Sequence, residues 1–262
     1  MNMYAFAKVK KDAGVTTVEI DHAPANTLSS ACIHELRALF RELDQDEETK
    51  VIILTGAGRF FVAGADIKEF VSAFGDPEKA LALAAAGQAL CNEVENMQKP
   101  VIAAINGPAL GGGLELALGC HYRIAAQNAI VGLPELKLGL IPAFGGTQRL
   151  SKAVGTAVAT QLILSSKQLT AEEAVNINLV QAVVPLEELL PTATIVAQSL
   201  IEGKSMTSVT RALACITHSG QGSLAEGLKK EREKFAELFA TADAKEGIQA
   251  FIEKRKPQFT HS

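Results

Sequence analysis

The chain has 262 residues, of which 48% are hydrophobic and 21% are charged, and its formal net charge is −4. A chain of this length and composition can bury a full hydrophobic core, as one large domain or as one domain with a small appendage. The weakly acidic balance argues against nucleic acid or an anionic membrane as the main partner.

Cysteine usage and the N-terminal sequence indicate the cellular setting. The four cysteines lie far apart, without a Cys-x-x-Cys pair: Cys32, Cys91, Cys120 and Cys215. This spacing argues against a disulfide framework or a zinc site and favours a reducing environment. Residues 1–11 lack the apolar core of a signal peptide, and no apolar run is long enough to cross a bilayer. We therefore expect a cytoplasmic protein that does not associate with membranes.

Predicted strands and helices alternate through the first part of the chain. A strand rich in β-branched residues covers Val15–Ile20, and Ser29 or Ser30 can cap the helix that follows it. In that helix, apolar residues recur at helical spacing. The next three elements are a buried strand, a helix and a second buried strand, at Val51–Thr55, Pro77–Met97 and Val101–Ile105.

A glycine-rich stretch follows the second buried strand. Asn106-Gly107-Pro108 breaks the apolar run, Gly111-Gly112-Gly113 follows, and Glu115 lies in the first turn of a short apolar helix. The end of a strand, a bare loop and a helix N-terminus can together direct backbone N–H groups at a developing negative charge. We interpret this stretch as half of an active site.

The rest of the chain changes from mixed structure to helices alone. Thr170 with Glu173, and Asp243 with Glu246, form capping-box patterns that predict helix starts. From Glu187 onward only helices are predicted. The organisation is therefore an α/β core at residues 1–190 with a helical region at 191–262, which we expect to pack on a neighbouring subunit. Three more short strands are predicted in the core, at Tyr122–Ala126, Ala129–Leu133 and Leu179–Val184.

The sequence lacks the motifs of several classes of enzyme. The sequence has no Gly-x-Ser-x-Gly elbow for a serine hydrolase, and its five histidines lack the spacing of zinc ligands. Gly56 and Gly58 follow a strand as in dinucleotide-binding folds, but the third glycine is misplaced, which leaves a dehydrogenase as a weak alternative. We expect no metal.

Two carboxylates in apolar surroundings remain as candidates for chemistry. Glu115 lies inside an apolar helix, and Glu135 lies between apolar segments. Burial should raise the pKa of each carboxyl toward the range useful for proton transfer. Taken singly, Glu115 could instead serve a helix N-terminus, and Glu135 could be an exposed first-turn residue after Pro134. Together they suggest two acids beside an oxyanion hole, which could add water to an activated carbonyl compound or move its protons.

Five blocks of the sequence resemble the crotonase superfamily, and specifically enoyl-CoA hydratases. They come in the order and with the spacing of that family, and the similarity extends over nearly the whole chain, to a final segment at Phe251–Lys256. The blocks are Ala63-Gly64-Ala65-Asp66-Ile67-Lys68, Pro100–Gly107, Gly111-Gly112-Gly113-Leu114-Glu115, Pro134-Glu135-Leu136-Lys137-Leu138-Gly139 and Gly145-Gly146-Thr147-Gln148-Arg149-Leu150.

The resemblance implies a fold, an assembly and a reaction. The fold would be a spiral of ββα units with C-terminal helices that form a trimer, and trimers pair into hexamers. The substrate would be a trans-2-enoyl-CoA of fatty acid β-oxidation, and coenzyme A would be part of the substrate and not a cofactor. The backbone N–H groups of Ala65 and Gly112 would form the oxyanion hole, while Glu115 and Glu135 would hold the water that adds in syn fashion. Residues that would contact the substrate are Ala63, Ala65, Asp66, Ile67, Lys68, Ala143, Phe144 and Lys254.

The presence of both glutamates favours a hydratase, since enoyl-CoA isomerases of the superfamily retain only the second acid. Where hydratases often have Pro-Gly-Ala-Gly-Gly, this chain has Pro142-Ala143-Phe144-Gly145-Gly146. Ala143 keeps a backbone N–H for the water, and Phe144 adds bulk that leaves the acyl-chain preference open. A hydratase of a branched acyl-CoA of the methylglutaconyl type, an isomerase and a crotonase-fold binding protein remain as alternatives. The sequence leaves open which glutamate is acid and which is base, and whether trimers or hexamers form.

Overall fold

A computed structural model of the chain describes residues 4–219 and 222–261. Its main sheet has six strands in the order β1-β2-β3-β4-β6-β9, of which only the β1–β2 pair is antiparallel. The strands are β1 (Ala7–Asp12), β2 (Val15–Ile20), β3 (Val51–Gly56), β4 (Val101–Ile105), β6 (Tyr122–Ala126) and β9 (Ala182–Val184). In a second sheet, β7 (Ile130–Gly132) pairs in parallel with β5 (Ala109–Leu110) and antiparallel with β8 (Gln168–Thr170).

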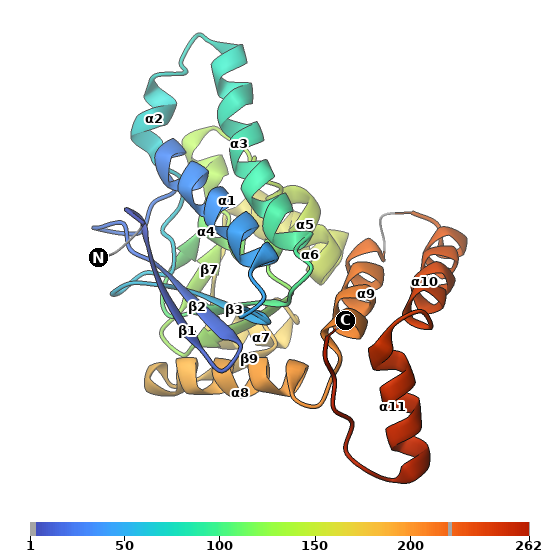
Figure 1. Cartoon of the computed structure of the whole chain (residues 1–262). Coiled ribbons are helices and arrows are strands. Elements are labelled where there is room, and N and C mark those ends of the chain that lie inside the picture. The colour runs from blue at the N-terminus through green and yellow to red at the C-terminus, as the bar shows by residue number, and fades with distance from the viewer. Residues whose placement is uncertain (1–3, 220–221, 262) are drawn as a thin grey trace.

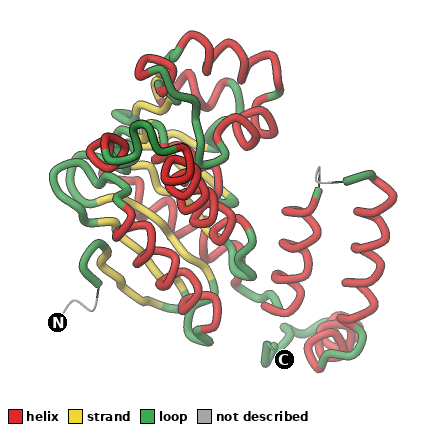
Figure 2. The backbone as a smooth tube through the Cα atoms, turned by 90° about the horizontal axis from the view of Figure 1, so that it is seen from above, coloured by secondary structure: helices red, strands yellow, loops and turns green. Residues whose placement is uncertain are grey.

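Helices cover both faces of the main sheet (Figures 1 and 2). On β3, Ile52 and Leu54 face the larger core, which includes residues of α1 (Ser30–Gln45), α3 (Pro77–Glu95) and α4 (Gly112–Gly119). Val51 and Ile53 of the same strand face α8 (Leu189–Ile201) in a second core. Because alternate side chains point to opposite faces, a strand buried on both sides must be apolar throughout. This explains the unbroken apolar runs in β3 and β4.

The shorter helices lie between these elements and complete the core. They are α2 (Ile67–Val71), the 3₁₀ helix η1 (Glu135–Leu138), α5 (Gly146–Val154), α6 (Thr156–Ser165), α7 (Ala171–Asn176) and the 3₁₀ helix η2 (Leu186–Glu188). In the part of the chain that the structure describes, no helix is both long and apolar enough to cross a bilayer.

The last three helices stand apart from the main sheet (Figures 1 and 2). They are α9 (Met206–His218), α10 (Leu224–Leu238) and α11 (Ala242–Glu253). Large apolar side chains on α10 and α11 are exposed, among them Leu224, Phe235 and Phe251. Helix α8 lies across the predicted division at residue 190, and its buried residues pack on the main sheet. The expected α/β core with a helical C-terminal region is confirmed.

The structure confirms one of the two predicted capping boxes. Thr170 and Glu173 exchange the expected pair of hydrogen bonds at the start of α7. The box assigned to Asp243 and Glu246 is wrong, because α11 begins two residues earlier than it predicts, at Ala242, and Thr241 accepts from the Ala244 N–H. Asp243 instead lies buried in the first turn, where it accepts hydrogen bonds from the C-terminal segment. The predicted strands at Ala129–Leu133 and Leu179–Val184 are both shorter in the structure.

Candidate active site

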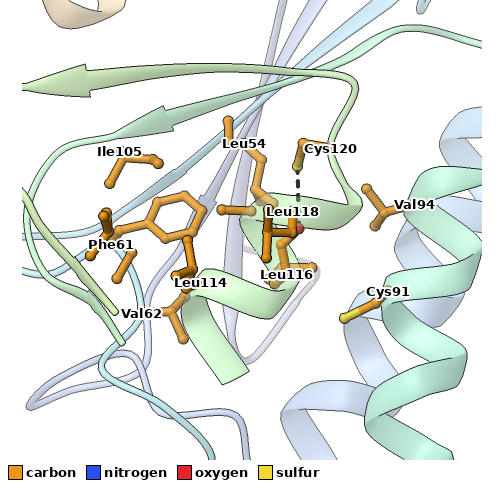
Figure 3. Packing of buried hydrophobic residues seen from close by; sticks show 14 of the residues in the cluster. Leu54, Phe61, Val62, Cys91, Val94, Ile105, Leu114, Leu116, Leu118 and Cys120 are labelled. Carbon is orange, nitrogen blue, oxygen red and sulfur yellow. Dashed lines mark hydrogen bonds between the residues drawn. The ribbon is translucent and has the colours of Figure 1, made fainter. Parts of the chain in front are cut away.

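Helix α4 is embedded in the core and carries the first candidate acid. All eight of its residues are buried, and Figure 3 shows Leu114, Leu116 and Leu118 packed among residues of neighbouring strands and of α3. The helix starts after Gly111, which has φ 52° and ψ −125°. Side chains strongly disfavour this backbone conformation, and glycine adopts it readily. A Cβ there would also lie 3.0 Å from Oε1 of Glu135, so the turn needs glycine for two reasons.

The backbone N–H groups of Ala65 and Gly112 have no acceptor among the described residues. They lie close together, because a Cβ built on Gly112 would be 3.4 Å from the Ala65 nitrogen. Leu28 holds the Ala65 segment in place by donating to the Gly64 carbonyl and accepting from the Asp66 N–H, at 2.9 and 3.0 Å. The pair can therefore donate to one oxygen atom, with the N-terminus of α4 adding its partial positive charge.

Glu115 is a buried carboxylate that is held by a separate loop. Its residue is 2% exposed, and its Oε1 accepts hydrogen bonds from the N–H groups of Phe144 and Gly146, at 2.8 and 2.7 Å. Burial raises the pKa of Glu115 to about 7, and the charge of Glu135 adds to the rise, while the two N–H groups and Arg149 oppose it. Glu115 can thus exchange protons near neutral pH.

Glu135 approaches the same place from η1, of which it is the first residue. Its Oε2 is buried and has no hydrogen-bond partner among the residues that the structure describes. Burial raises the pKa of this carboxyl above its usual range. A buried acceptor without a partner is costly, which points to a ligand or water as its partner in the working protein.

A largely apolar cavity of about 350 Å³ brings the predicted residues together. Its lining includes both acids, both residues with free N–H groups, and apolar side chains from α2, α3 and the loop after η1. Of the predicted contact residues, those that line it are Ala63, Ala65, Ile67, Ala143 and Phe144. Within the described residues, no group of three or more His, Cys, Asp or Glu side chains could hold a metal ion.

Three predicted contact residues are not part of the cavity lining. Asp66 caps α2 by accepting from the Lys68 N–H at 3.0 Å. Lys254 follows α11, in the helical region that stands apart from the main sheet (Figure 1). A wider, charged hollow of about 740 Å³ between Lys11, Lys50 and the C-terminal segment contains none of the predicted site residues.

Sequence reasoning missed one residue that supports the site. Arg149, in α5, donates to the Phe144 carbonyl at 3.2 Å and forms an ion pair with Glu95 at 2.7 Å. It therefore fixes the loop that holds Glu115. The arginine is part of a block that carried the family resemblance, and this was the only signal in the sequence.

Replacing Glu115 with glutamine is expected to stabilise the fold at alkaline pH. With a pKa near 7 in the folded protein and 4.5 as its reference, the carboxyl binds a proton more tightly when folded. The free energy of unfolding therefore falls as pH rises from 4.5 to 7, by about 3 kcal/mol in all. Glutamine keeps the acceptor oxygen and cannot ionise. The free energy of unfolding of Glu115→Gln should therefore exceed that of the wild type by up to about 3 kcal/mol at pH 8, and by little near pH 4.5.

Urea denaturation at the two pH values measures this difference. Glu172→Gln, at an exposed position in α7, is the control and should change stability little at either pH. An equal effect of Glu115→Gln at both pH values would contradict the raised pKa.

The chain is similar to proteins of one known family. Residues 10–262 match the family model described as enoyl-CoA hydratase/isomerase. A probable enoyl-CoA hydratase of Bacillus subtilis is 47% identical over 249 residues, which cover 95% of this chain and 96% of the relative. A short-chain-enoyl-CoA hydratase of Clostridium acetobutylicum is 40% identical over 250 residues, 95% of each chain. The crystal structure of an enoyl-CoA hydratase from Bacillus anthracis superposes with a TM-score of 0.92 at 37% identity, covering 98% of this chain and 100% of that one.

Proposed function

The chain belongs to the enoyl-CoA hydratase/isomerase family of the crotonase superfamily, and we propose that its hydratase activity is carried out by Glu115, Glu135 and the N–H groups of Ala65 and Gly112. The reaction is the syn addition of water to a trans-2-enoyl-CoA, which gives a 3-hydroxyacyl-CoA. The observation that carries the assignment of residues is the buried Oε2 of Glu135, which has no partner in the described part of the chain and lies in one cavity with Glu115.

The two free N–H groups act on the thioester oxygen. As the nucleophile adds at C3, negative charge moves onto this oxygen and an enolate forms. Donors that are already in place stabilise such charge without reorganisation. The N–H groups of Ala65 and Gly112 have no competing acceptor within the described chain, so they are available to the substrate.

The two carboxyl groups handle the water and its protons. Burial raises the pKa of both carboxyl groups, and the charge of Glu135 raises that of Glu115 further, so the pair holds a proton more readily than exposed glutamates do. In the proposed division, ionised Glu115 accepts a proton from the water as its oxygen bonds to C3. Protonated Glu135 then delivers a proton to C2, and the pair exchanges the remaining proton between turnovers. No cofactor takes part, since coenzyme A belongs to the substrate.

We also propose that the chain works as a trimer or as a pair of trimers. The exposed apolar side chains of α10 and α11, among them Leu224, Phe235 and Phe251, would be covered by neighbouring subunits. Lys254 does not line the cavity of its own chain, so it would contact coenzyme A bound to a neighbour. Sedimentation of the whole chain measures the assembly, and a monomer at micromolar concentration would contradict this proposal.

Turnover of enoyl-CoA thioesters tests the proposed function. The purified protein should abolish the absorbance of the conjugated enoyl thioester as the 3-hydroxyacyl product forms. A panel of acyl chains that differ in length and branching also identifies the preferred substrate. Binding of every thioester without turnover would instead indicate a protein with the fold but not the activity.

A further inference from the structure

The ring of Phe144 fills a slot that has glycine on both sides. On one side lies Gly87 of α3, where a Cβ would overlap the ring atoms Cγ, Cδ1 and Cε1. On the other side lies Gly112, where a Cβ would be 3.1 Å from Cδ2 and Cε2. Phe144 is 5% exposed, so the slot encloses its side chain almost completely. Even one methyl group on Gly87 would require the ring to move.

The backbone of Phe144 is tied to the reacting groups. Its N–H donates to Oε1 of Glu115 at 2.8 Å, and its carbonyl accepts from Arg149 at 3.2 Å. The far edge of its ring lies against Gly112, whose N–H is one of the two free donors. A shift of Phe144 away from α3 therefore acts on Glu115 and on Gly112 together.

Neither the surrounding sequence nor the geometry of the helix explains why position 87 is a glycine. Gly87 lies in the interior of α3, where glycine is unfavourable relative to alanine. It is buried, and its backbone angle is not in the left-handed region that would favour glycine. The atoms that a Cβ would meet most closely all belong to the Phe144 ring. The space left for this ring therefore accounts for the glycine.

We propose that Gly87 is a positioning residue, which acts through the Phe144 ring to set the alignment of Glu115 and Gly112. The role rests on the proposed function of these two residues. A methyl group at position 87 pushes the ring toward Gly112 or into the cavity, and the first movement misaligns the reacting groups. Small misplacements of this kind cost up to about 100-fold in rate. Gly87 thus controls catalysis from outside the cavity, which it does not line.

A double-mutant cycle with Phe144 tests whether Gly87 acts through the Phe144 ring, which we call the relay below. Gly87→Ala should lower kcat for hydration by about 10- to 100-fold and change KM less. Phe144→Ala empties the slot and will itself lower activity, but adding Gly87→Ala to it should change kcat by less than about twofold, because no ring remains to be displaced. Gly227→Ala is the matched control, since a Cβ at this helical glycine of α10 meets no atom within 4 Å, and it should leave kcat unchanged.

Each other result overturns the relay. A wild-type kcat for Gly87→Ala, a change in KM alone, or an equal loss of kcat in the Phe144→Ala background would each contradict it. If Gly87→Ala does not fold, the double variant should still fold and match Phe144→Ala, and its failure to do so would also contradict the relay. Failure of the proposed function is distinct, because the wild-type protein would then not hydrate the substrate.

Discussion

Glu115→Gln and Glu135→Gln should each lower kcat for hydration by about 10²- to 10⁴-fold, the usual contribution of general acid–base groups. Glutamine at position 115 keeps the oxygen that accepts from Phe144 and Gly146, so the loop and the fold should stay in place. At position 135 it removes the proton that C2 receives. Initial rates with a short trans-2-enoyl-CoA measure both effects.

The decreases in kcat caused by the two single substitutions should not be additive. If the acids act as a unit on one water, the double variant should be only slightly slower than the slower single variant. Glu78→Gln, at an exposed position in the first turn of α3, is the control and should keep the wild-type rate. Hydration at the wild-type rate by either single variant would show that the mechanism assigned to the pair is wrong.

Removing the Ala65 N–H should lower kcat by about 10²- to 10³-fold, as expected for the loss of one oxyanion-hole donor. Replacing Ala65 with the corresponding α-hydroxy acid changes only the N–H to an oxygen atom and keeps the side chain. This N–H has no acceptor among the described residues, so the ester should cost stability only by making the Gly64 carbonyl a weaker acceptor for the Leu28 N–H. The effect should appear in kcat, because the thioester oxygen gains its negative charge during the reaction.

An ester at Ala57 is the matched control for this substitution. The Ala57 N–H donates to the Ile20 carbonyl at 2.8 Å, so its loss should weaken the fold and leave kcat unchanged. If the ester at Ala65 lowers kcat no more than the ester at Ala57 does, the N–H of Ala65 does not stabilise the enolate.

The sequence was sufficient to predict the buried strands and the apolar helix of the site. Residues 51–54 of β3 and all of β4 are apolar because both of their faces are covered, and this pattern is local. Helices α5 and α6 were not predicted, because each begins after a glycine, Gly145 or Gly155, without a side-chain cap. Asp243 with Glu246 matched a capping box by spacing, yet Thr241 two residues earlier provides the cap.

The site itself depends on contacts between distant segments. Nothing near Glu115 in the sequence indicates that the N–H groups of Phe144 and Gly146 hold its carboxylate. The pairing of Glu115 with Glu135 was inferred from their apolar surroundings and then from the family resemblance. The reason for glycine at position 87 becomes visible only when the ring of Phe144 is seen against it.

The most direct test of the proposed mechanism is the position of deuterium in product formed by the wild-type protein in D₂O. If water held between Glu115 and Glu135 adds in syn fashion, nuclear magnetic resonance of the 3-hydroxyacyl-CoA should find one deuterium at C2. This deuterium should lie on the same face as the new C3 hydroxyl group. Deuterium on the opposite face, or a product in which the double bond has moved instead of being hydrated, would contradict the proposed mechanism.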